Sequence, residues 1–342
     1  MRFDEGIFCV GVDQHATPLT VRESLTAGVG DRLIPYLIEH QGASEVVFLS
    51  TCNRVEIYGR STRRGPRMME SLFQSMPPDL GQAWREARGL YLHEGISCWR
   101  HLAEVATGLR SMVIGENEIL RQVRLAYTSA GVVGGANRGM HALFQSGLRA
   151  ARAARAAAGF GRGDASVGRL AAEALHEAMQ GRESRPLLLL GSGHTARSFA
   201  LVEHKRSAGP IWISSRSEDR ARLLAKEVEG EVVPWARWQK AVEASAVVVS
   251  ALAGGELPWN ADLSSSGPEL LIDLGVPRTM TAVRRSFPKA EWVDLEELSS
   301  KTEIRPEALG SIHRAEEVLR AHEILFAVGK KREPNRTRVG SG

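Results

Sequence analysis

The sequence is poor in cysteine, in long apolar runs and in excess charge of either sign, and each shortage excludes a class of protein. Its 342 residues include three cysteines, which is too few for a disulfide framework, so we expect the reducing cytoplasm. No apolar run approaches the roughly 18 residues that span a bilayer, so we expect no membrane partner. Asp4 and Glu5 follow Arg2 closely, which is unlike a signal peptide. After these exclusions, we expect an ordinary cytoplasmic protein of two or three domains.

The net charge of +4 is small, but the basic residues are unevenly distributed. Two groups of arginines stand out: Arg60, Arg63, Arg64 and Arg67 in one, and Arg149, Arg152 and Arg155, three residues apart, in the other. The second group would lie near one face of a helix. Either group could hold a phosphate backbone or form a solvated surface, and charge alone favours the solvated surface.

The first part of the chain mixes strands and helices. Apolar patterning predicts strands at residues 7–12, 45–49 and 54–58 and a helix at 32–40. From about residue 96 the pattern is mostly helical up to about residue 178, with glycine-rich breaks at 131–139 and 159–163. We therefore expect an α+β domain over residues 1–158, with a hinge near the second break.

The next part alternates strictly, which predicts a Rossmann-type, doubly wound parallel sheet over residues 164–298. Asp164 and Ser166 are candidate N-caps of a helix at 167–179. Strands are expected at 187–190, 211–214, 232–233, 246–252 and 270–274, and helices at 195–204, 218–227 and 236–243. Residues 299–342 would form one amphipathic helix, at about 305–327, and a basic disordered tail. The predicted fold class is multidomain α/β.

A glycine-rich turn joins the first strand of this second domain to its helix. It reads Gly191, Ser192, Gly193, His194, Thr195, Ala196, which fits the dinucleotide motif G-x-G-x-x-G/A in its required setting. The first glycine would make the turn, and the second would let a pyrophosphate approach the helix N-terminus. The alternative is a glycine-rich turn that binds no dinucleotide.

The following strand ends in S-S-R-S at residues 214–217. A site for NAD usually has an acid here for the ribose hydroxyls. Arg216 stands there instead, and a guanidinium can pair with a 2′-phosphate, so NADPH is favoured over NADH. The alternative is an ordinary surface arginine.

Cys52 lies in a polar turn between two apolar strands, which would put its sulfur at an exposed edge. The neighbouring Arg54 could lower the pKa of the thiol, so Cys52 is a candidate nucleophile. Cys9 and Cys98 lie in apolar surroundings and are expected to be packing residues. From chemistry alone, a structural role for Cys52 stays open.

Two segments carry a resemblance that covers the chain in order from about residue 10 to 294. Residues 48–58, F-L-S-T-C-N-R-V-E-I-Y, resemble the signature of glutamyl-tRNA reductases, and residues 108–123 resemble their G-L-x-S-M-V-x-G-E-x-x-I-L-x-Q-V block. Weaker matches are the R-E that ends residues 11–23 and D-L-G-V-P-R at 273–278. The resemblance departs from the family at Gln14, at Glu118 and at Arg121.

The resemblance implies an enzyme that reduces the glutamyl group of glutamyl-tRNA(Glu) with NADPH to glutamate-1-semialdehyde, the first step of the C5 route to 5-aminolevulinate and tetrapyrroles. Cys52 would form a thioester, and His101 would order it or transfer protons. The glutamate site would be lined by Thr51, Asn53, Arg54, Ser111, Glu116, Asn117, Glu118 and Gln122. No metal is implied. Glutamate-1-semialdehyde aminomutase is an implied partner.

The resemblance also implies a helical dimerisation domain that this sequence lacks beyond residue 342, so we expect a shortened member whose oligomeric state stays open. The helix at about 305–327 would be a remnant of that region, and its apolar stripe would pack on the chain's own domains. Two other functions compete with reduction of glutamyl-tRNA. One is a paralogue that binds glutamyl-tRNA without reducing it, and the other is a dehydrogenase of a free carbonyl compound.

Overall fold

The chain forms two compact units in the computed structural model, which describes residues 6–26, 32–161, 166–179, 186–206, 209–252, 255–260, 267–300 and 306–329. The first unit comprises Met1–Ser111, Ile119–Phe160 and Arg305–Gly342. The second comprises Met112–Glu118 and Gly161–Ile304. The segment that leads into helix α6 (Glu118–Val132) therefore belongs to the second unit, although the chain on both sides of it belongs to the first.

The first unit is built on a four-stranded antiparallel sheet in the order β2-β3-β1-β4. Its strands are β1 (Ile7–Asp13), β2 (Glu45–Ser50), β3 (Arg54–Arg60) and β4 (Tyr91–Glu94). Three of them confirm the predicted strands. β4 was not predicted, because its sequence Y-L-H-E has no apolar alternation and all four residues are only half-buried.

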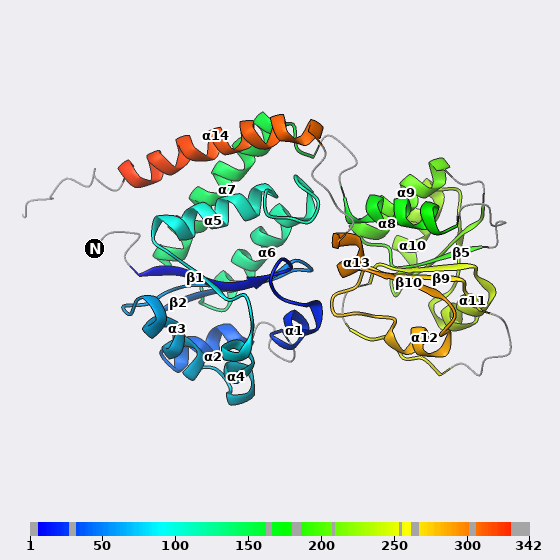
Figure 1. The fold of residues 1–342 in the computed structure, drawn as a ribbon, viewed down its shortest axis with the longest axis horizontal. Coiled ribbons are helices and arrows are strands. Elements are labelled where there is room, and N and C mark those ends of the chain that lie inside the picture. The colour runs from blue at the N-terminus through cyan, green and yellow to red at the C-terminus, as the bar shows by residue number, and fades with distance from the viewer. Residues whose placement is uncertain are drawn as a thin grey trace, which may run out of the picture. The chain divides into compact units, whose positions relative to one another are not determined.

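Helices cover both faces of this sheet (Figure 1). One side carries α1 (Leu19–Ser24), α2 (Leu33–Glu39), α3 (Gly65–Gln74) and α4 (Pro78–Glu86), and the other α5 (Ile96–Thr107), α6 (Glu118–Val132) and α7 (Arg138–Ala158). The predicted α2 and the long helical region are confirmed. α3 and α4 were not predicted, although both have a proline in the first turn, a position where its missing N–H costs nothing.

The C-terminal helix α14 (Pro306–Gly329) packs along α5 and α7 of the first unit. Leu319 is buried in the core of this unit, and Arg100 on α5 forms an ion pair with Glu323 at 2.7 Å. The predicted packing of the apolar stripe on the chain itself is confirmed for Leu319. It is wrong for Ile324 and Leu325, which are 63% and 65% exposed because they lie on the opposite side of the helix.

The second unit is a six-stranded parallel sheet in the order β10-β9-β8-β5-β6-β7, which confirms the doubly wound fold. The strands are β5 (Leu187–Leu190), β6 (Ile211–Ser214), β7 (Glu231–Val232), β8 (Val247–Ser250), β9 (Leu270–Asp273) and β10 (Glu291–Asp294). β5, β8 and β9 are buried throughout, as expected for strands covered on both faces. β10 was not predicted, because its sequence E-W-V-D has only two apolar residues between two acids and shows no strand pattern.

Helices lie on both faces of the second sheet, with α8 and α9 on one and α11 and α12 on the other (Figure 1). They are α8 (Val167–Ala178), α9 (His194–Arg206), α10 (Glu218–Glu227), α11 (Trp238–Ala244, preceded by a 3₁₀ turn, Trp235–Arg237), α12 (Thr281–Ser286) and α13 (Leu295–Ser300). Ser166 caps α8, since its Oγ accepts the Arg169 N–H at 3.2 Å. Asp164 and the predicted basic tail lie outside the described residues.

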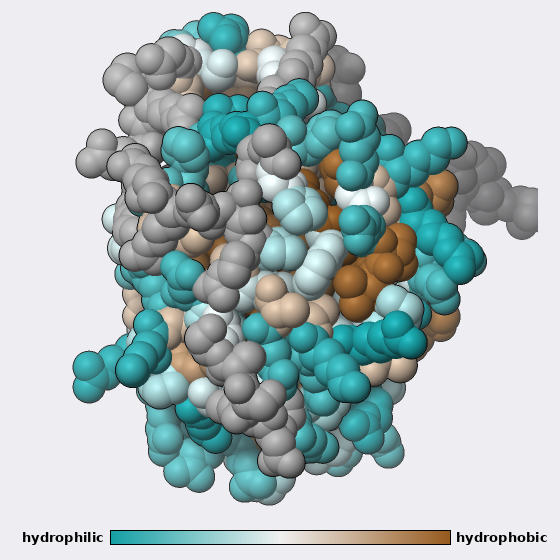
Figure 2. Space-filling view, turned by 90° about the vertical axis from the view of Figure 1, so that its right-hand side faces the viewer, coloured by the Kyte–Doolittle hydropathy of each residue, from teal (hydrophilic) through white to brown (hydrophobic). Residues whose placement is uncertain are grey.

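Over the part of the chain that the structure describes, no helix combines the length and apolar character that a bilayer crossing needs. The face in Figure 2 is mostly hydrophilic, with hydrophobic residues gathered in a small area.

Candidate active site

Cys52 lies in a tight loop between β2 and β3. The Thr51 Oγ1 accepts the backbone N–H groups of Asn53 and Arg54, both at 3.1 Å, and the Thr51 N–H donates to the Arg54 carbonyl at 2.9 Å. This closes the loop on itself and gives Thr51 a local role. Cys52 is partly exposed, whereas Cys9 and Cys98 are fully buried, as predicted. The loop therefore offers one reachable thiol in a fixed position.

Gln14, directly after β1, and Arg22, on α1, bind the backbone of this loop. The Gln14 N–H donates to the Asn53 carbonyl at 2.9 Å. Arg22, which is 3% exposed, donates to the Cys52 carbonyl and, at 3.2 Å, to the Thr17 carbonyl. Sequence reasoning gave Arg22 no role, although it is the arginine of the matched R-E. The structure assigns it to fixing the backbone of Cys52.

Arg54 points into the core and away from solvent, with only 1% of its surface exposed. Its guanidinium donates to Glu56 at 2.9 Å and to the Arg110 carbonyl. Glu56 pairs with the Arg54 guanidinium, and the expectation that Arg54 lowers the pKa of the Cys52 thiol stays a prediction. A contact between Arg54 and a substrate carboxylate stays a prediction.

The Glu56 carboxylate is the centre of a buried polar cluster. Its Oε1 accepts hydrogen bonds from Arg54 at 2.9 Å, Tyr91 at 2.6 Å and His101 at 2.7 Å, and its Oε2 accepts one from Tyr58 at 2.7 Å. Burial alone would raise the pKa of Glu56, but His101 and Arg54 hold that pKa well below its usual range. Glu56 is therefore a fixed anion that orients four side chains.

His101 is 2% exposed and is held from two sides. An ionised carboxylate only accepts, so the His101 Nε2 must carry the hydrogen toward Glu56. The Nδ1 is buried and, among the described residues, has no hydrogen-bond partner. His93 stacks on the ring at 4.3 Å, and burial together with His101 lowers the pKa of His93 to about 4. Glu56 thus fixes the orientation of the ring through Nε2, and Nδ1 is the ring nitrogen that no described residue engages.

Cys9, Glu56 and His101 bring three potential metal ligands within 4.8 Å of one another. Their chemistry does not fit a metal site. Both Glu56 oxygens already accept hydrogen bonds from the protein, and burial, then Glu56, raises the pKa of Cys9, whereas a metal ligand must be a thiolate. We interpret the trio as part of the buried polar cluster.

Sequence reasoning missed Glu56, Tyr58, Tyr91 and His93. One signal was available: the twofold period of β3 puts Arg54, Glu56 and Tyr58 on one side of the sheet. A buried acid between an arginine and a tyrosine on one face indicates a polar cluster. Tyr91 and His93 lie on the unpredicted strand β4, so no sequence signal could place them.

The predicted glutamate-site residues after Arg110 are spread over both units. Ser111 and Glu116 are each 7% exposed, Asn117 is exposed, and Glu118 and Gln122 are half-buried. Ser111 and Gln122 belong to the first unit, and the other three to the segment grouped with the second. Their convergence around Cys52 stays a prediction.

The glycine-rich loop has the backbone that a dinucleotide site needs. Gly191 has φ +115°, and a Cβ there would lie 2.7 Å from the Ala251 carbonyl oxygen, so only glycine fits. A Cβ on Gly193 would meet nothing within 4 Å, which leaves open space at the start of α9. Ala196 is fully buried. The fold itself requires the first glycine, whereas no described residue lies within 4 Å of a Cβ at the second.

The polar residues at the end of β6 lie beside this loop. Ser192 and Ser215 share a hydrogen bond at 2.8 Å, and the Ser214 carbonyl accepts the Gly191 N–H at 2.8 Å. Arg216 follows and is exposed. Residues 214–217 contain no acid, in agreement with a 2′-phosphate rather than a free ribose hydroxyl at this position. His194 and Thr195 form the first turn of α9.

The basic face expected on α7 is incomplete. Arg149 and Arg152 are exposed, but Arg155 is 6% exposed and donates to the Thr107 carbonyl at 2.9 Å. The prediction that all three arginines share a solvent-facing patch is therefore wrong, because Arg155 caps the last turn of α5.

A Rossmann-type unit and a separate unit with a reachable cysteine define a class of dinucleotide-dependent enzyme. Comparison with known proteins agrees. A family model described as "Glutamyl-tRNAGlu reductase, N-terminal domain" matches residues 10–158, and one described as "Shikimate / quinate 5-dehydrogenase" matches residues 171–301.

Relatives match over most of the chain. Glutamyl-tRNA reductase 2 of Anaeromyxobacter dehalogenans is 30% identical over 97% of this chain and 75% of its own length. Glutamyl-tRNA reductase of Salinibacter ruber is 29% identical over 93% of this chain and 67% of its own. Among solved structures, glutamyl-tRNA reductase from Methanopyrus kandleri is similar at 24% identity and a TM-score of 0.47, covering 96% of this chain and 79% of that one. The chain belongs to the glutamyl-tRNA reductase family, which consists of NADP-dependent oxidoreductases.

Proposed function

We propose that this protein reduces the glutamyl group of glutamyl-tRNA(Glu) to glutamate-1-semialdehyde through a thioester on Cys52. The observation that carries the proposal is the single reachable thiol in a loop fixed by Thr51 and Arg22, in a chain that belongs to this family. The product is the precursor of 5-aminolevulinate, so the reaction is the first step of tetrapyrrole synthesis.

The first step is acyl transfer to Cys52. The thiolate attacks the ester carbonyl carbon, the bond to the 3′ oxygen of the tRNA breaks, and that oxygen leaves with the electron pair and takes up a proton. His101 would manage protons in this step, and its hydrogen bond to Glu56 fixes the orientation of its ring. Arg22 keeps the loop backbone in place.

The second unit fits a dinucleotide cofactor. Gly191 makes the turn, the open space at Gly193 admits a pyrophosphate, and the first turn of α9 supplies backbone N–H groups. Arg216 would hold the 2′-phosphate. When bound there, NADPH would supply the hydride that converts the thioester to a hemithioacetal. Its collapse re-forms the carbonyl, releases the aldehyde and returns Cys52 as a thiolate.

The glutamate itself would be held by polar groups of the loop and of the segment after Arg110. Asn53 and Arg54 offer donors, and Glu116 and Glu118 offer carboxylates for the substrate ammonium. Ser111, Asn117 and Gln122 would complete the set. We place the reaction in the cytoplasm, where the three cysteines stay reduced, and glutamate-1-semialdehyde aminomutase would accept the product there.

A paralogue that binds glutamyl-tRNA without reducing it is the alternative. Purified protein should oxidise NADPH, followed at 340 nm, when glutamyl-tRNA(Glu) is added and not when free glutamate or uncharged tRNA is added. Binding of glutamyl-tRNA without NADPH oxidation would favour the non-reducing paralogue. Oxidation with a free carbonyl compound alone would favour an ordinary dehydrogenase.

A further inference from the structure

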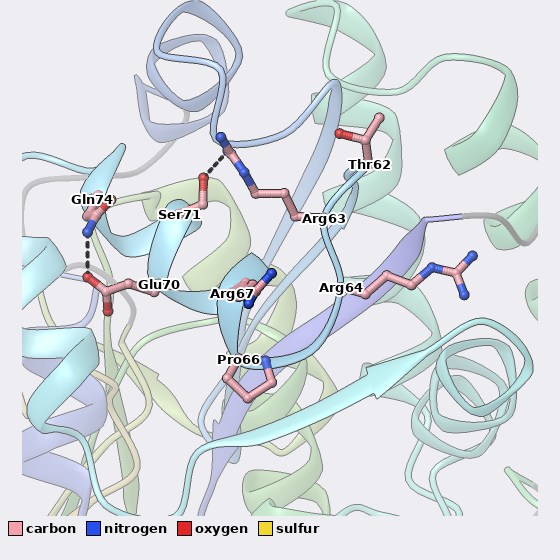
Figure 3. Close-up of a pocket in the computed structure, with 8 residues that line it drawn as sticks. All are labelled: Thr62, Arg63, Arg64, Pro66, Arg67, Glu70, Ser71 and Gln74. Atoms are coloured by element: carbon pink, nitrogen blue, oxygen red, sulfur yellow. Dashed lines mark hydrogen bonds between the residues drawn. The ribbon is translucent and has the colours of Figure 1, made fainter.

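Three arginines line a hollow at the start of α3 that the proposed chemistry does not use. The hollow has a volume of about 790 Å³ and is lined by Thr62, Arg63, Arg64, Pro66, Arg67, Glu70, Ser71 and Gln74 (Figure 3). All three arginines are exposed, and they come from the loop after β3 and the first turn of α3.

These arginines differ from several others of the first unit, which are paired with acids. Arg54, Arg60, Arg85, Arg100 and Arg110 each form an ion pair with a carboxylate of the chain. Within the described ranges, the hollow's arginines form none.

Glu70 in the lining of the hollow and Glu94 beside Gly65 are already engaged. Glu70 accepts from Gln74 at 2.8 Å and pairs with Arg85 at 3.2 Å, while Glu94 accepts the Gly65 N–H at 3.1 Å. Arg63 donates to the uncharged Ser71 hydroxyl (Figure 3). The hollow therefore presents three positive charges to solvent that no carboxylate of the described residues pairs with.

The lining indicates what kind of anion it fits. Guanidinium groups bind phosphate oxygens in bidentate geometry. None of the eight lining residues is aromatic, so the hollow offers no aromatic platform of the kind on which proteins stack single-stranded bases. A surface of this composition suits the sugar-phosphate backbone, which positions a nucleic acid without reading its sequence.

The hollow and Cys52 adjoin opposite ends of one strand. Asp13 pairs with Arg54 beside the Cys52 loop, whereas Phe8 pairs with both Gly59 and Glu94 beside α3. β3 runs between these ends for six residue steps, or about 20 Å. A single ligand with its ester at Cys52 and phosphates in the hollow must be long, which fits a polynucleotide and not a free nucleotide.

We infer that Arg63, Arg64 and Arg67 bind backbone phosphates in the body of the tRNA substrate and position its aminoacyl end for Cys52. This inference rests on the proposed function. It assigns tRNA binding to the α3 hollow in place of the incomplete arginine face on α7.

The test compares two double charge reversals. Arg64→Glu with Arg67→Glu alters the hollow, and Arg237→Glu with Lys240→Glu changes an exposed surface of the second unit by the same charge. Binding of uncharged tRNA(Glu) is measured over a range of salt concentrations, with urea unfolding to check that both variants fold. We expect the affinity of the first variant for tRNA to be lower by a factor of about ten or more. The slope of its log affinity against log salt concentration should be smaller by about 2, and the control should match the wild type.

Further arms separate the sources of failure. Glutamyl-adenosine keeps the ester but has no phosphate, so its turnover should be equal in the hollow variant and the wild type. Loss of glutamyl-tRNA binding after Arg149→Glu with Arg152→Glu, but not after reversal in the hollow, would overturn the inference. The inference would also be overturned if the wild type bound inorganic phosphate tightly in the hollow while the hollow variant kept the tRNA affinity of the wild type. If the wild type itself fails to oxidise NADPH with glutamyl-tRNA, the proposed function fails, whereas tRNA binding still tests the hollow.

Discussion

The two candidate sites of this protein are built in opposite ways. The Gly191 loop works through backbone: one glycine with φ +115° and a second with open space above it. The Cys52 site works through side chains, with a buried anion, Glu56, that holds Arg54 and His101 in place. The comparison shows that a backbone site is encoded within six residues, whereas the cysteine site depends on strands far apart in the chain.

The largest effect is expected at the reactive atom. Cys52→Ser should lower the rate of glutamyl-tRNA reduction by at least about a thousandfold, because an alcohol is a far poorer nucleophile at neutral pH. NADPH oxidation measures this, and Cys98→Ala is the matched control, since that thiol is buried. A serine variant that reduces glutamyl-tRNA at a rate near that of the wild type would contradict a thioester intermediate on Cys52.

The buried anion should matter to stability as well as to activity. Glu56→Gln leaves Arg54 charged and buried without its partner, and we expect the free energy of unfolding to fall by about 3–5 kcal/mol. Glu70→Gln breaks the exposed pair with Arg85 and should cost less than about 1 kcal/mol. Urea denaturation of both variants gives the comparison, and equal losses would contradict the central role of Glu56.

The pH dependence of stability, compared between the wild type and Glu56→Gln, tests whether Glu56 acts as an anion. The pKa of Glu56 is depressed in the folded state, so its stabilisation is fully present above the unfolded carboxyl pKa of about 4.3 and is lost as the pH falls toward the folded value. The stability gap between wild type and Glu56→Gln should therefore narrow below about pH 4 and stay constant from pH 6 to 8. A gap independent of pH down to acid unfolding would contradict this.

At the backbone site, the two glycines should behave differently. Gly193→Val should fold normally, because its side chain meets only open space, yet weaken NADPH binding by about tenfold or more. Gly191→Ala should destabilise the second unit, since its Cβ would meet the Ala251 carbonyl at 2.7 Å. Fluorescence titration with NADPH and thermal unfolding separate these outcomes. Unchanged NADPH affinity in Gly193→Val would contradict the binding of the pyrophosphate at this loop.

The smallest effect concerns cofactor choice. Arg216→Ala should weaken NADPH by about tenfold, which is about 1.4 kcal/mol, and leave NADH nearly unchanged, because only NADPH carries the 2′-phosphate. The ratio of the two dissociation constants is the measurement. Equal losses for both cofactors would return Arg216 to an ordinary surface position.

Much of this fold could be predicted from sequence, for reasons visible in particular segments. The apolar runs of β5, β8 and β9 are buried on both faces, and the loop after β5 carries its own glycine pattern. β4 was missed because its four polar or half-buried residues show no period.

The cysteine site was predictable only in part. Cys52, Thr51 and Asn53 form a local turn, but two of the partners of Glu56, Tyr91 on β4 and His101 on α5, come from elements far along the chain. Arg155 was assigned to the surface because helical spacing does not reveal that its guanidinium reaches the end of α5. Long-range contacts of this kind leave no local pattern.

The thioester on Cys52 is tested most directly by following the glutamyl group without cofactor. Glutamyl-tRNA(Glu) labelled in the glutamate is mixed with protein in the absence of NADPH and then treated with ribonuclease. The account predicts label on the protein in the peptide that contains Cys52, released by hydroxylamine, absent from Cys52→Ser and chased to aldehyde when NADPH is added. Aldehyde formation without any labelled protein, or equal label on Cys52→Ser, would contradict it.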